Sequence, residues 1–319
     1  MNKFFICTNI IQLVNFYLFS KDYKSEIYVF IINYESKNFK LKKQIKLFSN
    51  KLGFIFIDNI NELLLKKNSY IDLISRNELN KHELYFINNF KIKNWFIVED
   101  GLGDYLLSFK NFNICKFFYL LVKTKELFMS NFRKVYHRLF TKNKRSFKFE
   151  TKVKSKLICE NNYYYSNFQN LMKINDSSFN KYKIIIIGSI YNYSKNDFST
   201  IYDLMKKQSD KMNINENDIL YIPHPRLDPL KLDVIKMNYK WNILENEYIA
   251  EQIISLNKDA IIWSALSTSI IFARFIYNNQ CSIFMLDKLK YYENLSSYIK
   301  IKSISCYLKS IGSKIMRVN

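Results

Sequence analysis

The sequence predicts an α/β fold in which two doubly wound domains of similar size follow one another along the chain. Two observations predict this fold class. Short apolar runs, which are typical of buried strands, alternate with longer amphipathic segments, which are typical of helices. The alternation stops in a basic linker, 133–182, that is rich in Asn, Tyr and Ser, and it then starts again. We therefore expect an N-terminal domain over residues 1–155 and a C-terminal domain over residues 156–319.

In the N-terminal half, strands are predicted where Ile, Val and aromatic residues cluster. The predicted strands are 4–7, 26–32, 54–57 and 94–99, and the helix after the first strand is 10–19. The last of these strands ends at Asp100, and Gly101 lets the chain turn away. The strand thereby delivers the Asp100 carboxylate to the rim of the predicted sheet, which suits a general base. A tight turn capped by acidic residues is the alternative interpretation.

In the C-terminal half, three predicted strands lead directly into residues that suit phosphate chemistry. The predicted strands are 183–187, 219–222, 260–263 and 281–286, and the predicted helices are 197–212, 247–256 and 267–277. Ligands of open α/β sheets bind outside the carboxyl ends of the strands. The residues that follow the first three strands are therefore the candidates for a binding site.

His224 lies between Pro223 and Pro225 at the end of a predicted strand. The two prolines restrict the backbone on both sides, so the imidazole is held ready for a positioned role. Histidine is also the side chain that most easily exchanges a proton near neutral pH. Arg226 could bind a phosphate or a carboxylate through two hydrogen bonds. A rigid turn with an incidental histidine is the alternative.

Hydroxyl side chains gather where the strand 260–263 meets the predicted helix 267–277, and the motif 264–269 contains Ser264, Ser267, Thr268 and Ser269. Such hydroxyls can bind a phosphate together with the backbone N–H groups of a helix N-terminus. Gly188 and Ser189, after strand 183–187, form a weaker candidate of the same kind. Simple helix capping is the alternative for both motifs.

The strongly basic composition does not by itself indicate a nucleic-acid interface. The formal net charge is +21, with 49 Lys and Arg against 28 Asp and Glu, but only seven of the basic residues are Arg. Arginine is the side chain that reads phosphate and guanine bidentately. We therefore interpret most of the lysine as a solvated surface. The densest basic stretch, 133–156, is either an ordinary surface helix and linker or a contact with an acidic membrane.

The remaining composition predicts a cytoplasmic protein without a metal. The five cysteines are odd in number and form no C-x-x-C pair, which is typical of a reducing compartment. No apolar run approaches the roughly 20 residues of a membrane span, and no cleavage site follows the N-terminal run. D-x-D, Walker A, H-E-x-x-H and G-x-S-x-G motifs are absent. If the protein is an enzyme with a phosphate leaving group, its own side chains and backbone groups would therefore have to neutralise the charge of that group.

The order of these motifs resembles the bacterial sialyltransferases of glycosyltransferase family 52, which act on lipooligosaccharide and capsule and have the GT-B fold. The resemblance covers most of the chain. It rests on the opening Thr8, Asn9 and Gln12, on Glu99-Asp100-Gly101-Leu102-Gly103, on Gly188-Ser189, on Pro223-His224-Pro225-Arg226 and on Ile249-Ala250-Glu251.

The resemblance implies an inverting transfer of sialic acid from CMP-sialic acid to a terminal galactose or similar sugar of a bacterial surface glycan. It implies two Rossmann-like domains that face a central cleft. Asp100 would deprotonate the acceptor hydroxyl, and His224 would donate a proton to the departing CMP phosphate. The implied donor-binding residues are Gly188, Ser189, Arg226, Glu251, Ser264, Ser267 and Thr268, and the implied acceptor-binding residues are Thr8, Asn9, Gln12 and Gly101. No metal or cofactor is expected besides the donor substrate.

Two other functions stay open at this stage. A GT-B transferase of the same family could use another nucleotide sugar. A module driven by its charge could bind membranes or nucleic acid, with a steep salt dependence and no need for Asp100. The expected partners are a nucleotide-sugar donor and a glycan or glycolipid acceptor, and no nucleic acid. We also expect 133–156 to contact the inner face of the cytoplasmic membrane. The linkage formed and the oligomeric state, with a homodimer as one alternative, are left open.

Overall fold

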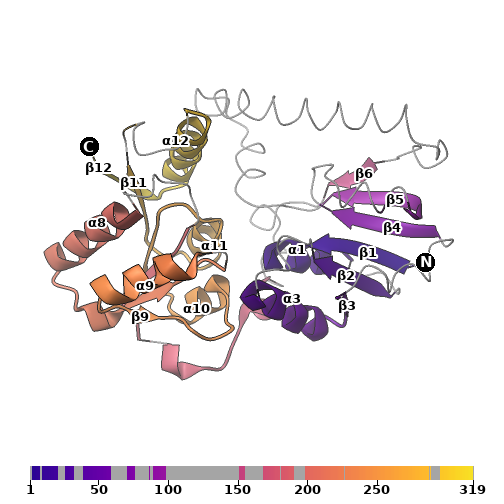
Figure 1. Cartoon of the computed structure of the whole chain (residues 1–319), viewed down its shortest axis with the longest axis horizontal. Coiled ribbons are helices and arrows are strands. Elements are labelled where there is room, and N and C mark those ends of the chain that lie inside the picture. The colour runs from indigo at the N-terminus through magenta and orange to yellow at the C-terminus, as the bar shows by residue number, and fades with distance from the viewer. Residues whose placement is uncertain are drawn as a thin grey trace. The chain divides into compact units, whose positions relative to one another are not determined.

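The structure, a computed structural model, contains two compact units. It describes residues 2–7, 9–20, 26–31, 39–58, 70–75, 86, 89–97, 151–154, 168–179, 181–189, 198–225, 227–286, 288 and 295–318. The described residues up to 154 belong to one unit and those from 168 onward to the other. Each unit is built around its own six-stranded sheet (Figure 1). None of the helices described is long and apolar enough to cross a bilayer.

The first sheet has the strand order β3-β2-β1-β4-β5-β6, and all of its strand pairs are parallel. Its strands are β1 (Asn2–Cys7), β2 (Ile27–Ile31), β3 (Ile55–Ile57), β4 (Tyr70–Ser75), β5 (Lys91–Ile97) and β6 (Thr151–Lys154). The helices α1 (Ile10–Ser20) and α3 (Phe39–Lys51) lie together on one face (Figure 1). Phe86 and Phe90 pack with Phe4 on the other face.

The second sheet has the strand order β12-β11-β10-β7-β8-β9, again with only parallel pairs. Its strands are β7 (Ile184–Ile187), β8 (Ile219–Ile222), β9 (Asn242–Ile243), β10 (Ile261–Ser264), β11 (Cys281–Leu286) and β12 (Lys314–Val318). The intervening helices are α8 (Phe198–Lys211), α9 (Pro229–Asn238), α10 (Ala250–Leu256), α11 (Ser269–Ile276) and α12 (Leu295–Ser310). The four isoleucines of β7 are all buried, as in a central parallel strand covered on both faces.

The two sheets have the same topology. In each, the chain forms a strand, adds two strands on one side of it, and then crosses over to add three on the other side. This is the Rossmann strand order, and the crossing marks a switch point between β1 and β4 and between β7 and β10. The structure therefore confirms the predicted α/β class and the two Rossmann-like doubly wound units.

The predicted linker 133–182 needs correction where the structure describes it. β6 adds an edge strand to the first sheet, and residues 168–172 form a short helical segment of the second unit. Phe168 is fully buried and stacks on Phe272 of α11 at a ring distance of 4.8 Å. Neither element was predicted from this basic segment, because an edge strand and a helix that buries only one face need few apolar residues. The strands β4, β9 and β12 and the helices α3, α9 and α12 were also not predicted.

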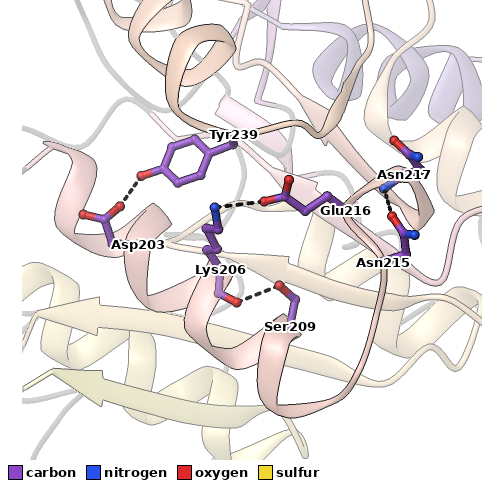
Figure 2. A network of polar contacts seen from close by, with 7 residues as sticks. All are labelled: Asp203, Lys206, Ser209, Asn215, Glu216, Asn217 and Tyr239. Atoms are coloured by element: carbon purple, nitrogen blue, oxygen red, sulfur yellow. Dashed lines mark hydrogen bonds and ion pairs between the residues drawn. The ribbon is translucent and has the colours of Figure 1, made fainter.

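Polar contacts tie α8 to the segments on either side of β8 (Figure 2). Tyr239, just after α9, donates a hydrogen bond of 2.6 Å to Asp203 of α8. Lys206 of α8 lies 3.2 Å from the carboxylate of Glu216, in the 3-10 turn η6 (Glu216–Asp218) that leads into β8. Burial raises the pKa of Tyr239, and the Asp203 carboxylate raises it further. These contacts fix the strand whose end carries His224.

The first sheet contains a buried polar cluster formed by Lys3, Asp72 and Asn94. Lys3 of β1 and Asp72 of β4 are register partners and are only 4% and 3% exposed. A register shift between β4 and β5 aligns Asn94 with Asp72, and its amide donates a 2.7 Å hydrogen bond to the carboxylate. Burial lowers the pKa of Lys3, and the charge of Asp72 partly restores it. A buried carboxylate is tolerated only with such partners.

We expect Asn94→Ala to destabilise the protein by about 1–3 kcal/mol, because the buried Asp72 carboxylate loses its amide donor. Lys93→Ala is the matched control, since Lys93 is exposed and is skipped by the register. Its effect should stay within about 0.5 kcal/mol. The free energy of unfolding from urea titrations followed by circular dichroism measures both. Equal stability of the two variants would contradict the role given to Asn94.

Candidate functional site

The site in the second unit begins at Gly188, directly after β7. Its amide donates a 2.8 Å hydrogen bond to the carbonyl of Ile222 at the end of β8. A Cβ atom on Gly188 would lie 2.7 Å from the Tyr221 hydroxyl, 2.9 Å from the backbone nitrogen of His224 and 3.0 Å from the Ile222 carbonyl oxygen. Two of these three neighbours are backbone atoms, which cannot move aside cheaply. Only glycine therefore lets the turn after β7 lie against the loop that carries His224.

Two buried tyrosines, Tyr202 and Tyr221, lie next to the turn at Gly188 and Ser189. The backbone N–H of Ser189 donates a hydrogen bond to the hydroxyl of Tyr202 in α8. That hydroxyl lies 3.3 Å from the hydroxyl of Tyr221, and the two rings meet edge to face. Burial raises the pKa of Tyr202 to about 12 and that of Tyr221 well above its usual value, so both stay neutral. Neutral hydroxyls can both donate and accept, and the pair fixes the position of Ser189.

Ser264, the last residue of β10, joins the third strand end to the first. It is fully buried, and its hydroxyl donates a 3.0 Å hydrogen bond to the carbonyl of Ile187 at the end of β7. The turn that follows, Ala265 and Leu266, is also buried. The carboxyl ends of β7, β8 and β10 are thus held together at the switch point of this sheet.

The hydroxyl motif after β10 has an outer and an inner layer. Ser267 and Thr268 are partly exposed, whereas Ser269 and Glu251 are 7% and 5% exposed. The Ser269 hydroxyl donates a 2.6 Å hydrogen bond to the Glu251 carboxylate, and the Ser267 hydroxyl donates to Ser269 at 3.2 Å. The backbone N–H of Ser269 donates to the Ser267 hydroxyl oxygen at 3.3 Å. Burial raises the pKa of Glu251, and the bond from Ser269 opposes that shift.

His224 is half-buried and begins a turn in which the N–H of Leu227 donates to its carbonyl at 2.9 Å. Asp228 then caps α9 by accepting from the N–H of Leu230, with Pro229 as the first helical residue. The turn and the Asp228 cap restrict the backbone after His224, and Pro223 restricts the backbone before it. The sequence therefore holds the histidine backbone at both ends.

In the first unit, Asn9 and Gln12 stand at the start of α1. The Asn9 side chain accepts a 2.9 Å hydrogen bond from the N–H of Gln12, so it caps the helix. The Cys7 thiol donates to the Asn9 carbonyl at 2.9 Å. Gln12 is fully buried. Both residues lie just beyond β1, at the switch point of the first sheet.

Several predicted site residues lie outside the described part of the chain. These are Asp100, Gly101, Arg226, Thr8 and most of the basic stretch 133–156. The structure brings Gly188, Ser189, His224 and Ser264 to neighbouring strand ends, because Gly188 bonds to Ile222 and Ser264 bonds to Ile187. It also links Ser267 to Glu251 through Ser269. Within the described residues, no group of three or more His, Cys, Asp or Glu gathers as a metal site would.

Ser269 belongs to the predicted hydroxyl motif 264–269, although not to the predicted donor-binding residues, and no sequence motif points to Tyr202. Ser269 had a usable signal, because a serine at the first position of a helix that follows a strand is typical of a cap or a phosphate site. Tyr202 had none, because a tyrosine inside an amphipathic helix normally belongs to the core. Its contact with Ser189 depends on how α8 packs against the sheet.

The switch point of the second unit therefore has the features of a nucleotide-binding site. Three strand ends meet, a glycine allows close backbone approach, and hydroxyls line the start of a helix. The sequence model of the family described as alpha-2,8-polysialyltransferase (POLYST) matches residues 3–284. The chain belongs to this family. The sialyltransferase class predicted from the motifs is thereby confirmed at the level of the family.

Solved structures of a sugar transferase resemble the chain more distantly. E. coli heptosyltransferase WaaC with ADP is 7% identical, with a TM-score of 0.40 over 100% of this chain and 94% of that chain. WaaC with ADP-2-deoxy-2-fluoro heptose is also 7% identical, with a TM-score of 0.38 over 97% and 99% of the two chains. No curated protein sequence matches the chain significantly.

We expect Gly188→Ala to lower the free energy of unfolding by about 1–3 kcal/mol, because the added methyl group overlaps two backbone atoms and the Tyr221 hydroxyl. In a Tyr221→Phe background the same substitution should cost less, since one of the three close contacts is gone. Urea unfolding of the two single variants and the double variant measures this coupling. A Gly188→Ala protein that unfolds at the wild-type urea concentration would contradict the tight packing.

Proposed function

We propose that this member of the polysialyltransferase family is an inverting, metal-independent sialyltransferase that uses CMP-sialic acid. The observation that carries the proposal is the contact of Gly188 with the backbone of His224 at the switch point of the second unit. This contact sets a candidate general acid beside a turn suited to phosphate. We further propose the specific relation to family 52, whose motifs the sequence resembles.

In the proposed mechanism the second unit, residues 156–319, binds the donor. The turn at Gly188 and Ser189 and the start of α11 would hold the CMP half, with Arg226 adding positive charge. His224 would donate a proton to the phosphate as it leaves, which removes the need for a metal. Ser264 would act by fixing the end of β10, because its own hydroxyl proton is already given to Ile187.

The first unit, residues 1–155, would bind the acceptor. Asp100 would take the proton of the attacking hydroxyl, and Thr8, Asn9, Gln12 and Gly101 would line the acceptor side. The cap that Asn9 forms on α1 supports a fixed geometry at this end of the first sheet. A GT-B arrangement, in which the two units face a central cleft, would bring the base to the donor carbon.

For the acceptor we propose a terminal sugar of a bacterial surface glycan, either galactose or an earlier sialic acid. The family description, alpha-2,8-polysialyltransferase, supports the second alternative, in which sialic acid is added to sialic acid. We place the enzyme in the cytoplasm, with the basic stretch 133–156 at the inner face of the membrane, where lipid-linked glycans are found. A homodimer remains part of the proposal.

We expect Asp100→Asn and His224→Ala each to lower turnover by about 100-fold or more, because each removes a proton-transfer group. CMP release from CMP-sialic acid, with galactoside and α2,8-sialoside acceptors offered separately in the presence of EDTA, measures this. The matched controls are Asp58→Asn, an exposed carboxylate paired with Lys42, and His82→Ala, a histidine outside any motif.

Both controls should keep wild-type turnover, and all four variants should keep the wild-type circular dichroism spectrum. If CMP is released only when metal is supplied, the metal-independent mechanism is wrong. Turnover that survives both Asp100→Asn and His224→Ala would overturn the assignment of base and acid. Preferential binding of UDP over CMP would point to another nucleotide sugar.

We expect the protein to sediment with vesicles that contain anionic lipid at low salt and to be released as the salt concentration rises. The ten Lys and Arg of 133–156, against one acid, supply the attraction. Replacing five of these residues with Ser should weaken sedimentation. Replacing five exposed Lys outside the stretch, including Lys43 and Lys207, should weaken it much less. Equal loss in both variants would assign the attraction to net charge alone.

A further inference from the structure

Ser267 and Ser269 of the candidate site form a chain of hydrogen bonds that leads from the partly exposed Ser267 to the buried carboxyl group of Glu251. Ser267 is partly exposed, whereas Ser269 and Glu251 are almost fully buried. The hydrogen bonds from Glu251 toward the partly exposed Ser267 run through Ser269. The Ser269 hydroxyl bridges them, at 2.6 Å from the Glu251 oxygen and 3.2 Å from the Ser267 oxygen.

The direction of these hydrogen bonds follows from counting protons. A serine hydroxyl has one proton to donate and two lone pairs to accept with. Ser269 gives its only proton to Glu251, so the bond between the serines uses the proton of Ser267. The Ser267 oxygen also accepts from the backbone N–H of Ser269. In this state Ser267 presents a lone pair, and no proton, toward a ligand.

A phosphate ester oxygen needs a donor and is repelled by a lone pair. If Glu251 binds a proton, every bond of the relay reverses. Glu251 then donates to Ser269, Ser269 donates to Ser267, and the Ser267 proton becomes available to the phosphate. Both lone pairs of Ser267 are then filled, one by the Ser269 hydroxyl and one by the Ser269 backbone N–H, so the reversed state is fully hydrogen-bonded.

The surroundings of Glu251 favour such a switch. Burial raises the pKa of this carboxyl, which favours the protonated form relative to that of an exposed glutamate. On the described elements α11 and η4, which pack against α10, the charged groups on or next to them have other partners. Arg274 of α11 contacts the Ile311 carbonyl and the Asn278 side chain. Asp176, which precedes the 3-10 turn η4 (Ser177–Phe179), accepts from Tyr248.

We propose that binding of an anionic nucleotide phosphate at Ser267 is coupled to the uptake of one proton by Glu251. Glu251 is then a positioning residue, which acts through Ser269 and sets the polarity of the Ser267 hydroxyl. The proposal rests on the proposed function, since it takes the nucleotide phosphate of the donor as the ligand. It gives Glu251 an indirect role in phosphate binding instead of the direct contact with the donor that the resemblance implies.

The sign of the linkage follows from the bond directions. The bound phosphate favours the protonated relay, so it raises the pKa of Glu251. Affinity is then highest below the pKa of the free protein and falls as the pH rises toward the pKa of the complex. Between the two values the affinity falls by about tenfold per pH unit.

Isothermal titration calorimetry with cytidine 5′-(methyl phosphate) tests this directly, because the phosphodiester of this probe does not titrate near neutral pH. Titrations between about pH 5 and pH 8, in buffers of different ionisation enthalpy, give the affinity and the number of protons taken up. The difference in proton uptake between wild type and Glu251→Gln isolates the protons taken up by Glu251, since any proton taken up by His224 is common to both proteins.

We expect Glu251→Gln to bind the probe with nearly the low-pH affinity of wild type and to take up about one proton fewer than wild type. Its side-chain amide donates permanently to Ser269. Ser269→Ala should lose the coupling between probe binding and proton uptake although Glu251 is still present. This variant replaces Glu251→Gln as the test if Glu251→Gln fails to fold. Glu245→Gln, an exposed residue paired with Lys236, should behave as wild type.

Proton uptake by Glu251→Gln or Ser269→Ala that equals wild type would overturn the proposal, and so would a wild-type affinity that does not change with pH. A folded wild-type protein that binds neither CMP nor the probe at any pH would instead refute the proposed function, and the coupling with it.

Discussion

The close approach of Gly188 to the end of β8 is the constraint on which the candidate site depends. The hydrogen bond from the Gly188 N–H to the Ile222 carbonyl continues the pairing with β8 by one residue beyond the end of β7. It leaves no room for a side chain, and it sets the turn after β7 against the backbone of His224. The bond from Ser264 to Ile187 does the same on the other side of β7. The strand ends are therefore fixed before any ligand binds.

Preorganisation of this kind has a specific advantage for a transferase whose leaving group is a phosphate. Charge that develops on the leaving group is stabilised best by groups that need not move when the reaction occurs. The buried hydroxyls of Tyr202 and Tyr221, which lie close to Ser189, supply such fixed dipoles. The interior of the second unit is thus organised around polar groups as well as around its isoleucine-rich strands.

Much of this could be predicted from the sequence, for definite physical reasons. β7, β8 and β10 are central strands covered on both faces, so their residues are continuously apolar and their ends are sharp. The polar residues at those ends were therefore recognisable as site candidates. β4 was not predicted, because Asp72 interrupts its apolar pattern. Only the register with Lys3 and Asn94 explains why a carboxylate is tolerated there. The Ser269 relay and the Tyr202 contact depend on packing between segments far apart in the sequence.

In the proposed mechanism, the switch point of the second unit binds the CMP half of the donor. A crystal structure of the full chain with CMP tests it most directly. We expect the phosphate within hydrogen-bond distance of the Ser267 hydroxyl and beside the turn at Gly188 and Ser189, with the His224 imidazole facing a phosphate oxygen. CMP bound at the carboxyl end of β1 and β4 in the first unit, with the turn at Gly188 empty, would contradict it.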